Sequence, residues 1–403
     1  MNASHPPTRA AGLERLARFV PAAGRDYAAK RNYDLPGQGH PHVSQLSPYL
    51  RHRLVTEEEV LEAVLERYSL ANAEKFVAEV CWRTYWKGWL ELRPSAWAEY
   101  RRDLDHIDRT GVAKAEAGQT DIDAFNAWTR ELVETGYLHN HARMWFASIW
   151  IFTLGLPWQA GADFFMRHLL DGDPASNTLS WRWVAGLQTH GKHYVARSSN
   201  ISKYTDGRHN PEWRLNTQAE PLSGPPHPVP RAAPVSDEVQ PGLATAILLH
   251  DDDLAPDALT DHLSDNIVGL AGLLSVQRRS PQGVSPLVAG FALGALDDAV
   301  ARWGQRFGQP GPIMDDGRHL VDWAKSNGIE QIVTPYAPTG PTSSALRRLR
   351  PQLDEHGIDL VQIVRAWDRA AWSHATHGFF RFKKHIPDLL SHLTLDRDRL
   401  ENI

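Results

Sequence analysis

A proline-rich stretch divides the chain into two parts of different character. Residues 217–242 contain seven prolines and few large apolar residues, which is typical of an extended linker. Proline lacks a backbone N–H and fixes φ, so this stretch fits neither a helix interior nor a central strand. We therefore expect three parts: residues 1–216, the linker 217–242, and residues 243–403.

The pattern of residues 1–216 predicts helices only. The segment 56–68 (TEEEVLEAVLERY) begins with a threonine that can cap a helix, and Glu59 follows three residues later. Apolar residues then recur at helical spacing, and the segments 72–92, 121–136 and 141–155 continue in the same way. Strand-like alternation is missing from these segments, so the first part is expected to be all-helical.

After the linker, predicted strands alternate with predicted helices. TAILLHDDD (245–253) reads as a buried strand that ends in acids, and residues 291–308 read as an amphipathic helix. Residues 319–336 and 344–366 each repeat helix, glycine stop and strand. This alternation indicates a parallel-sheet, Rossmann-like α/β domain. No GxGxxG or GxxxxGK[ST] motif follows a strand, so a phosphate loop is not predicted.

Composition excludes several classes of protein. The single cysteine, Cys81, excludes a disulfide framework and a cysteine-rich zinc or iron–sulfur site. Histidines at HxH and HxxH spacing have no acid or cysteine at ligand spacing, so we predict no metal site. No apolar run approaches the ~20 residues of a membrane span, and the N-terminus lacks the apolar core of a signal peptide. We therefore expect a cytoplasmic monomer without a membrane partner.

Charge excludes a uniformly basic nucleic-acid binder. The net charge is −5, and residues 1–216 hold 26 Lys and Arg against 25 Asp and Glu. A nucleic-acid site would therefore be a local patch. Three segments are candidates for phosphate contacts: RHR (51–53), residues 191–204 and residues 207–214.

Six short segments of the first part could carry chemistry. Taken singly, each has an ordinary structural explanation, such as a helix cap, an intrahelical Glu79–Arg83 ion pair or tryptophans in the core. Helical spacing also puts Asn140, Arg143 and Met144 on one face. In chain order, the segments are YAAKRNY (27–33), SQLSPYL (44–50), EVCWR (79–83), HNHARM (139–144), LPWQAG (156–161) and DGDPASNTLSWRW (171–183).

Taken together, these segments resemble the FAD-binding helical domain of the DNA photolyase and cryptochrome family, from about Tyr27 to about Pro211. The resemblance implies an FAD cofactor, with residues 44–47 at its phosphates, Asp171 and Asp173 at its adenine–ribose end, and Asn177 facing flavin N5. A neutral amide there leaves the anionic reduced flavin undisturbed. The implied cofactor-binding residues are Tyr27, Ser44, Gln45, Leu46, Ser47, Phe76, Arg83, Asn140, Arg143, Asp171, Asp173 and Asn177.

The resemblance also implies light-driven repair of UV-damaged DNA. Trp82 and Trp183 match the aromatic residues that sandwich an extruded pyrimidine dimer, Glu79 matches the acid that bonds it, and Met144 lines the same pocket. Trp181 and Trp158 match the first two members of the electron-transfer chain that photoreduces FAD; Trp97, Trp145 and Trp150 are candidates for the third. The implied catalytic residues are Glu79, Trp82, Asn177, Trp181 and Trp158.

The resulting functional expectation is a deoxyribodipyrimidine photo-lyase, a carbon–carbon lyase that uses blue light to split cyclobutane dimers. A cryptochrome-like photoreceptor without repair is one alternative, and a (6-4) photolyase is another. The latter typically carries a second histidine where Asn140 follows His139 here. A flavin-free α/β enzyme would need a phosphate loop or nucleophile motif, which residues 243–403 do not show.

The order of the two domains departs from the family. Residues 243–390 resemble the α/β domain that the family places first, here moved behind the helical domain: TAILLHDDDL resembles its first strand and GFFRFKKHIP its exit segment. The binding of an antenna chromophore, the preference for single or double strands and the role of this domain stay open.

Overall fold

Helices form all the regular structure of the first half of the chain. The computed structural model describes residues 5–263, 266–307, 310–315, 317–391 and 393, and up to Pro211 these contain helices without strands. The helices are α1 (Arg9–Phe19), η1 (Val20–Ala22), α2 (Arg25–Lys30), η2 (Pro36–Gln38), α3 (Ser47–Arg51), α4 (Glu57–Leu65), α5 (Leu70–Glu91), α6 (Ser95–Asp103), α7 (Val112–Glu116), α8 (Asp123–Thr135), α9 (Asn140–Ser148), the π-helical turn η3 (Ile149–Thr153), α10 (Trp158–His168), α11 (Pro174–Ala185) and α12 (Ser198–Tyr204).

Helix starts follow from local side-chain chemistry. The predicted cap of α4 is confirmed: the Glu59 amide donates to Thr56 Oγ1 at 3.3 Å, and the Thr56 amide donates to a Glu59 carboxylate oxygen at 2.9 Å. At α11, Asp173 accepts from the amides of Ala175 and Ser176, and Pro174 occupies the first helical position. These caps fix where the two helices enter the core.

The linker 217–242 contains no helix or strand and touches both parts of the molecule. The amide of Leu222 donates to Ala185 O, and the amide of Arg231 donates to Leu92 O in the helical part. Further along, the amide of Asp237 donates to Gln362 O at the sheet. The linker is therefore an extended segment whose backbone is hydrogen-bonded to both parts of the molecule.

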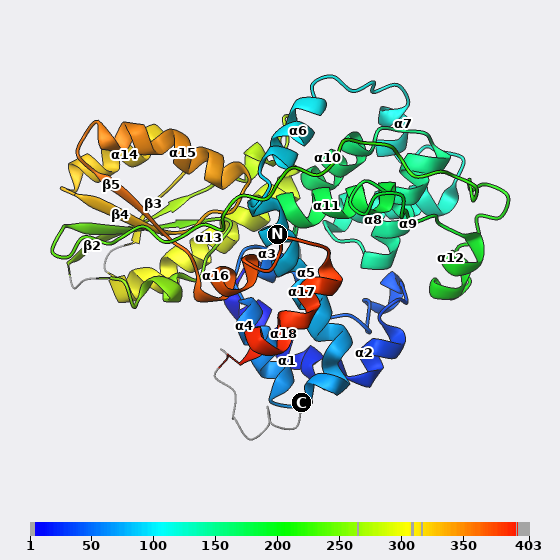
Figure 1. Cartoon of the computed structure of the whole chain (residues 1–403), viewed down its shortest axis with the longest axis horizontal. Coiled ribbons are helices and arrows are strands. Elements are labelled where there is room, and N and C mark those ends of the chain that lie inside the picture. Colours follow the sequence, from blue (N-terminus) through cyan, green and yellow to red (C-terminus); the bar gives the residue numbers. More distant parts are fainter. Residues whose placement is uncertain (1–4, 264–265, 308–309, 316, 392, 394–403) are drawn as a thin grey trace.

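Five parallel strands form the predicted α/β part. Their order is β3-β2-β1-β4-β5, with β1 at the centre. Figure 1 shows α13 on the side of the sheet toward the helical part, and α14 and α15 on the other side. The elements are β1 (Thr245–His250), η4 (Pro256–Leu259), β2 (Ile267–Leu273), η5 (Val276–Arg279), α13 (Pro286–Phe307), β3 (Pro310–Met314), α14 (Gly317–Ser326), β4 (Gln331–Pro335), α15 (Pro341–Asp354) and β5 (Asp359–Ile363).

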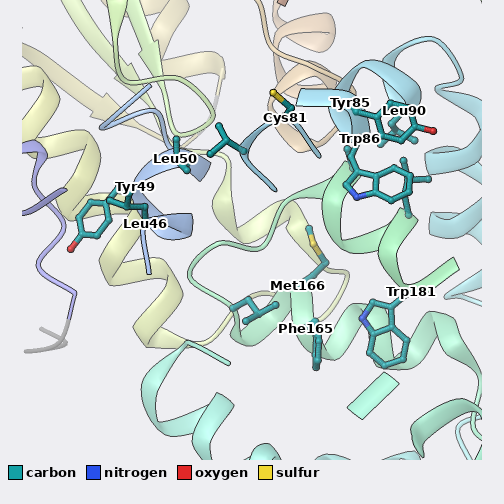
Figure 2. Packing of buried hydrophobic residues seen from close by; sticks show 14 of the residues in the cluster. Leu46, Tyr49, Leu50, Cys81, Tyr85, Trp86, Leu90, Phe165, Met166 and Trp181 are labelled. Carbon is teal, nitrogen blue, oxygen red and sulfur yellow. The ribbon is translucent and has the colours of Figure 1, made fainter. Parts of the chain in front are cut away.

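The two faces of the sheet enter two different cores. Alternate residues of a strand point to opposite faces. Ile247 and Leu249 of β1 pack in the core shared with α13 and the helical part, while Ala246 and Leu248 pack under α14 and α15. Figure 2 shows side chains of the larger core from α3, α5, α10 and α11, among them Tyr49, Trp86, Phe165 and Trp181.

The last helices leave the sheet and pack on α5. These are α16 (Ala366–Trp372), α17 (Phe379–Phe382), η6 (Lys383–His385) and α18 (Ile386–Leu390). Trp367 Nε1 donates to Thr84 Oγ1 at 3.1 Å, and the Tyr85 hydroxyl donates to His377 O at 2.8 Å. A Cβ on Gly88 would lie 2.7 Å from the Trp372 ring, so only glycine allows this approach. Residues 366–390 thus pack with the helical part, although the sequence places them with the sheet.

A buried ion network joins the two parts at the carboxyl end of β1. The Arg53 guanidinium lies 2.9 Å from Asp253, 2.7 Å from Asp368 and 3.2 Å from Glu57. Asp253 also pairs with Arg365 at 2.6 Å, and Arg51 pairs with Asp252. All these side chains are buried.

Burial of the segment RHR (51–53) overturns one prediction made from the sequence. Arg51, His52 and Arg53 are buried, so the expectation that they contact DNA phosphates at the surface is wrong.

Burial alone would raise the pKa of Asp253, but Arg365 and Arg53 hold it well below its usual range. The carboxylate is therefore ionised, and each cation of the network depends on its partners.

We expect Asp253→Asn to lower the free energy of unfolding by about 3–5 kcal/mol, because Arg53 and Arg365 would lose their shared buried carboxylate. Since pairing lowers the pKa of Asp253, this stabilisation is present above about pH 4 and is lost as the pH falls below it. Urea unfolding at several pH values measures both effects.

The matched control is Glu14→Ala, which removes the exposed pair with Arg18 and should change stability by less than about 1 kcal/mol. An equally small loss for Asp253→Asn would contradict a structural role of the network.

Candidate functional site

A cavity of about 510 Å³ lies within the helical part, between α2, α5, α9 and α11. It falls in the size range of small-molecule sites. All of the predicted site residues line it except Asp173 and Trp158. The lining residues are Tyr27, Ser44, Gln45, Leu46, Ser47, Phe76, Glu79, Trp82, Arg83, Asn140, Arg143, Met144, Asp171, Asn177, Trp181 and Trp183.

One ion pair lies in the wall of this cavity. An Arg143 terminal nitrogen donates to Asp171 Oδ2 at 2.9 Å, and Arg143 Nε donates to Leu138 O at 2.7 Å. The other oxygen of Asp171 and the Ser176 hydroxyl are buried and have no hydrogen-bond partner within the described residues. Both residues line the cavity, so they present unused hydrogen-bonding capacity to a ligand with hydroxyl or amino groups.

The neighbouring amide and the serine loop are also held in place. Asn177 Nδ2 donates to Ala162 O at 2.8 Å, which fixes how the amide stands in the wall. In the loop before α3, the Leu46 amide donates to Ser44 Oγ at 3.3 Å, and Gln45 has a positive φ of 51° with its side chain bonded to Gly39 O. Helical spacing predicted that Asn140, Arg143 and Met144 share a face, and all three line the cavity.

Asp173 lies just behind the wall. Its carboxylate caps α11 and lies 3.5 Å from Arg83, which also donates to Glu57 at 3.2 Å. Burial alone would raise the pKa of Asp173, but Arg83, Lys87 and Arg51 lower it to about 2. The intrahelical Glu79–Arg83 pair considered from the sequence does not form, because Arg83 is held by Glu57 and Asp173. A direct contact of Asp173 with a cofactor stays a prediction.

Each of the two tryptophans predicted for the dimer site, Trp82 and Trp183, has a second aromatic ring beside it. Phe379 of α17 stacks on Trp82, with ring centroids 3.7 Å apart and planes at 13°. Tyr194 lies against Trp183 at 6.1 Å and 23°. One face of Trp82 is thereby covered, and both indoles line the cavity. The sequence does not predict the stacking of Phe379 on Trp82, because the FF of GFFRFKKHIP resembles the exit segment of the α/β domain.

Glu79 also lines the cavity, about one helical turn before Trp82 on α5. Its carboxylate faces Arg31 at 3.9 Å, and 44% of its side chain is exposed. The surrounding cavity wall desolvates the group and raises its pKa above the usual value. The Glu79 carboxyl group offers hydrogen-bonding oxygens to a ligand in the cavity.

The two predicted relay tryptophans belong to two separate groups of buried aromatic residues. Trp181 packs edge-on against Trp150 at 6.1 Å, while Trp158 stacks on Tyr100 at 5.7 Å. Tyr100 in turn lies 5.2 Å from Trp97. Trp145 and Trp150 are fully buried and Trp97 is 8% exposed, so none of the three candidates for a surface member of a relay reaches solvent openly.

Sequence reasoning missed several residues that line the cavity. Five further residues line the cavity, and nothing in their local pattern distinguishes them from core residues: Arg31, Tyr137, His141, Trp86 and Phe165.

Two predicted phosphate-contact segments remain, 191–204 and 207–214. Their basic residues are exposed: Lys192, Arg197, Lys203, Arg208 and Arg214. Arg208 is already paired with Asp34 at 2.7 Å.

Comparison with known proteins agrees with this geometry. Residues 76–211 match the family described as the FAD binding domain of DNA photolyase. The deoxyribodipyrimidine photo-lyase of Streptomyces griseus is 36% identical over 159 residues, which are 39% of this chain and 34% of that protein. The cryptochrome DASH of Natronomonas pharaonis is 28% identical over 249 residues, 55% of this chain and 52% of that protein.

The chain thus spans about a third to a half of the length of these curated relatives. A class III photolyase from Agrobacterium tumefaciens aligns with a TM-score of 0.43 and 24% identity, over 49% of this chain and 42% of that one. Helices and cavity together define a helical ligand-binding domain. Residues 76–211 are thus similar to the FAD binding domain of DNA photolyase, the resemblance that the sequence predicts.

The described residues fit that cofactor. The unpartnered oxygens of Asp171 and Ser176 suit hydroxyl and amino groups, the serine loop suits phosphates, and the aromatic and apolar side chains suit a flat ring system. No helix of the described residues is long and apolar enough to cross a membrane.

Gly161→Ala should destabilise the protein by about 1–3 kcal/mol, because the new Cβ would lie 2.2 Å from the Trp181 ring and 3.0 Å from the Trp150 ring. Thermal and urea unfolding measure the loss.

Gly290→Ala is the control: it lies in α13 with no atom within 4 Å of the new Cβ, so it should stabilise by about 0.5–1 kcal/mol. If both variants gained stability, the Trp181 ring would not lie against α10 in solution.

Proposed function

We propose that this chain is a light-driven, FAD-dependent photolyase that repairs cyclobutane pyrimidine dimers in DNA. The observation that carries the proposal is one cavity in which the residues matching the flavin site and those matching the dimer site stand together. The relatives named photo-lyase support the same activity. Because the chain spans only part of those relatives, the activity and its DNA substrate rest on this geometry and on experiment.

Each cofactor-binding residue would contact a different part of FAD, according to its position in the cavity. Asp171 would accept hydrogen bonds from the adenine–ribose end of the cofactor, while the hydrogen bond from Arg143 orients that carboxylate. Residues 44–47 would hold the phosphates with hydroxyl and backbone donors, and the fixed Asn177 amide would face the flavin ring. Reduced FAD, when bound, supplies the electron that excitation by light transfers to the lesion.

Trp82, Trp183, Met144 and Glu79 would form the site for the lesion. An extruded dimer offers flat rings and polar edge groups, which suit two indoles and a carboxyl group. Phe379 and Tyr194 restrict the rotation of the two indoles, so less ordering is needed when DNA binds. Trp181 and Trp158 would pass electrons toward the cofactor during photoreduction.

The exposed segments 191–204 and 207–214 supply the local basic patch that a nearly neutral helical part needs to hold DNA. A photoreceptor without repair would not need the dimer walls, and their retention in one cavity favours repair.

The decisive experiment uses the purified, flavin-loaded and reduced protein with an oligonucleotide that carries one thymine cyclobutane dimer. Blue light should restore the 260 nm absorbance, whereas a dark control should not change. Recovery only with a (6-4) lesion would identify the other photolyase class. Failure with both lesions, in a sample that still binds reduced FAD, would favour the photoreceptor.

Phe379→Leu should weaken binding of dimer-containing DNA by about two- to tenfold, which corresponds to loss of one aromatic stack of about 0.5–1.5 kcal/mol. Phe382→Leu is the matched control: Phe382 is buried on the same helix and contacts Tyr85 rather than Trp82. Fluorescence anisotropy with damaged and undamaged oligonucleotides separates lesion recognition from general DNA affinity. Equal losses in both variants would mean that Phe379 only stabilises the fold.

A further inference from the structure

Three side chains converge outside the described cavity, on the far side of Tyr137. Asp34 follows α2, His40 follows η2, and Glu131 lies on α8. One ligand atom of each lies within 4.8 Å of the other two. His40 Nδ1 is 3.6 Å from Asp34 Oδ1, and His40 Nε2 is 3.3 Å from Glu131 Oε1. Glu131 is 91 residues from His40 in the chain, which explains why ligand spacing did not reveal the cluster.

Two buried polar atoms of the cluster have no hydrogen-bond partner among the described residues. Asp34 is fully buried; its Oδ2 accepts from Trp128 Nε1 at 3.2 Å and from Arg208 at 2.7 Å, while its Oδ1 accepts from nothing. His40, 6% exposed, likewise leaves Nδ1 unpaired. These two atoms face each other, and unpaired buried polar groups of this kind call for an explanation.

The charges of the cluster do not balance without a further cation. Two carboxylates face one guanidinium, that of Arg208. Asp34 is fully buried, and an unpaired charge is costly at such a place. A neutral His40 would therefore leave one negative charge without a counter-ion in the interior.

We propose that Asp34, His40 and Glu131 bind a divalent transition metal ion of the Zn²⁺ type. Two ligands of a tetrahedral ion, each at about 2.1 Å from it, lie about 3.4 Å apart, close to the 3.6 Å between His40 Nδ1 and Asp34 Oδ1. A mixed set of one imidazole and two carboxylates suits Zn²⁺ or Mn²⁺ better than Mg²⁺, which prefers oxygen ligands and retains its water.

The surroundings fit a rigid structural site. His139 stacks on the His40 ring at 5.6 Å and 19°, and Tyr137 packs edge-on against it at 5.4 Å. Arg208, bound to Asp34, would act as an outer partner that orients this ligand. The ion would tie the loop before residues 44–47, helix α8 and the exposed segment 207–214 to one point. The site is independent of the repair activity proposed above.

A protonated His40 between the two carboxylates is the rival arrangement, and metal analysis separates the two. Untagged protein is stripped with a chelator, incubated with Zn²⁺, gel-filtered and analysed for bound metal. We expect about one Zn²⁺ per chain in the wild type and less than about 0.2 in Asp34→Asn, His40→Asn and Glu131→Gln. The control His193→Asn removes a half-buried histidine that bonds a backbone carbonyl elsewhere, and should keep the metal.

Thermal unfolding of the wild-type protein is a second test, and its result does not depend on whether the variants fold. Zn²⁺ should raise its melting temperature, and that of His193→Asn, by several degrees, whereas Mg²⁺ at the same concentration should not. A wild-type protein that retains no Zn²⁺ and shows no shift would overturn the proposal. Retention that survives all three ligand substitutions would also overturn it, because the ion would then be bound elsewhere.

Discussion

The buried charges at the carboxyl end of β1 determine how the two parts of this molecule fit together. Three successive acids, Asp251 to Asp253, end the central strand and meet cations from the α3 region and from Arg279 and Arg365. Buried ions are tolerated only in a narrow range of geometries, because a displaced partner leaves a charge without solvation. The network therefore sets the position of the sheet against the helical part more strictly than apolar packing would.

Helix α5 connects this network of buried charges to the cavity. Arg83 belongs to the cavity wall and also bonds Glu57 and lies close to Asp173, which connects the wall to the interface. Glu79 and Trp82 stand on the same helix, against which α16 and α17 also pack, with Phe379 of α17 on the Trp82 ring. The sheet part thus contributes to the candidate site indirectly, through the helices that follow it.

Much of this arrangement could be predicted from sequence, because its signals are local. The Thr56 capping box, the glycine stops after α14 and α15, and the spacing of Asn140, Arg143 and Met144 all follow from short-range rules. Strands β2 and β3 were missed individually, because glycine and proline in IVGLAGL and PGPIM weaken the strand pattern. The burial of RHR (51–53) and the stacking of Phe379 on Trp82 depend on partners roughly 200–300 residues away, and no local rule reveals them.

The return of residues 366–390 to α5 has a consequence for the growing chain. Tyr85 and its partner His377 are 292 residues apart. At a synthesis rate of about 5–20 residues per second, α5 waits about 15–60 s before its covering helices exist. During that interval the apolar side of α5 that later meets Trp372 and Phe379 has no cover from its own chain. A nascent chain of this design is open to capture by chaperones at this surface of α5, and Trp82 in the cavity wall gains its stacking partner only after Phe379 has been made.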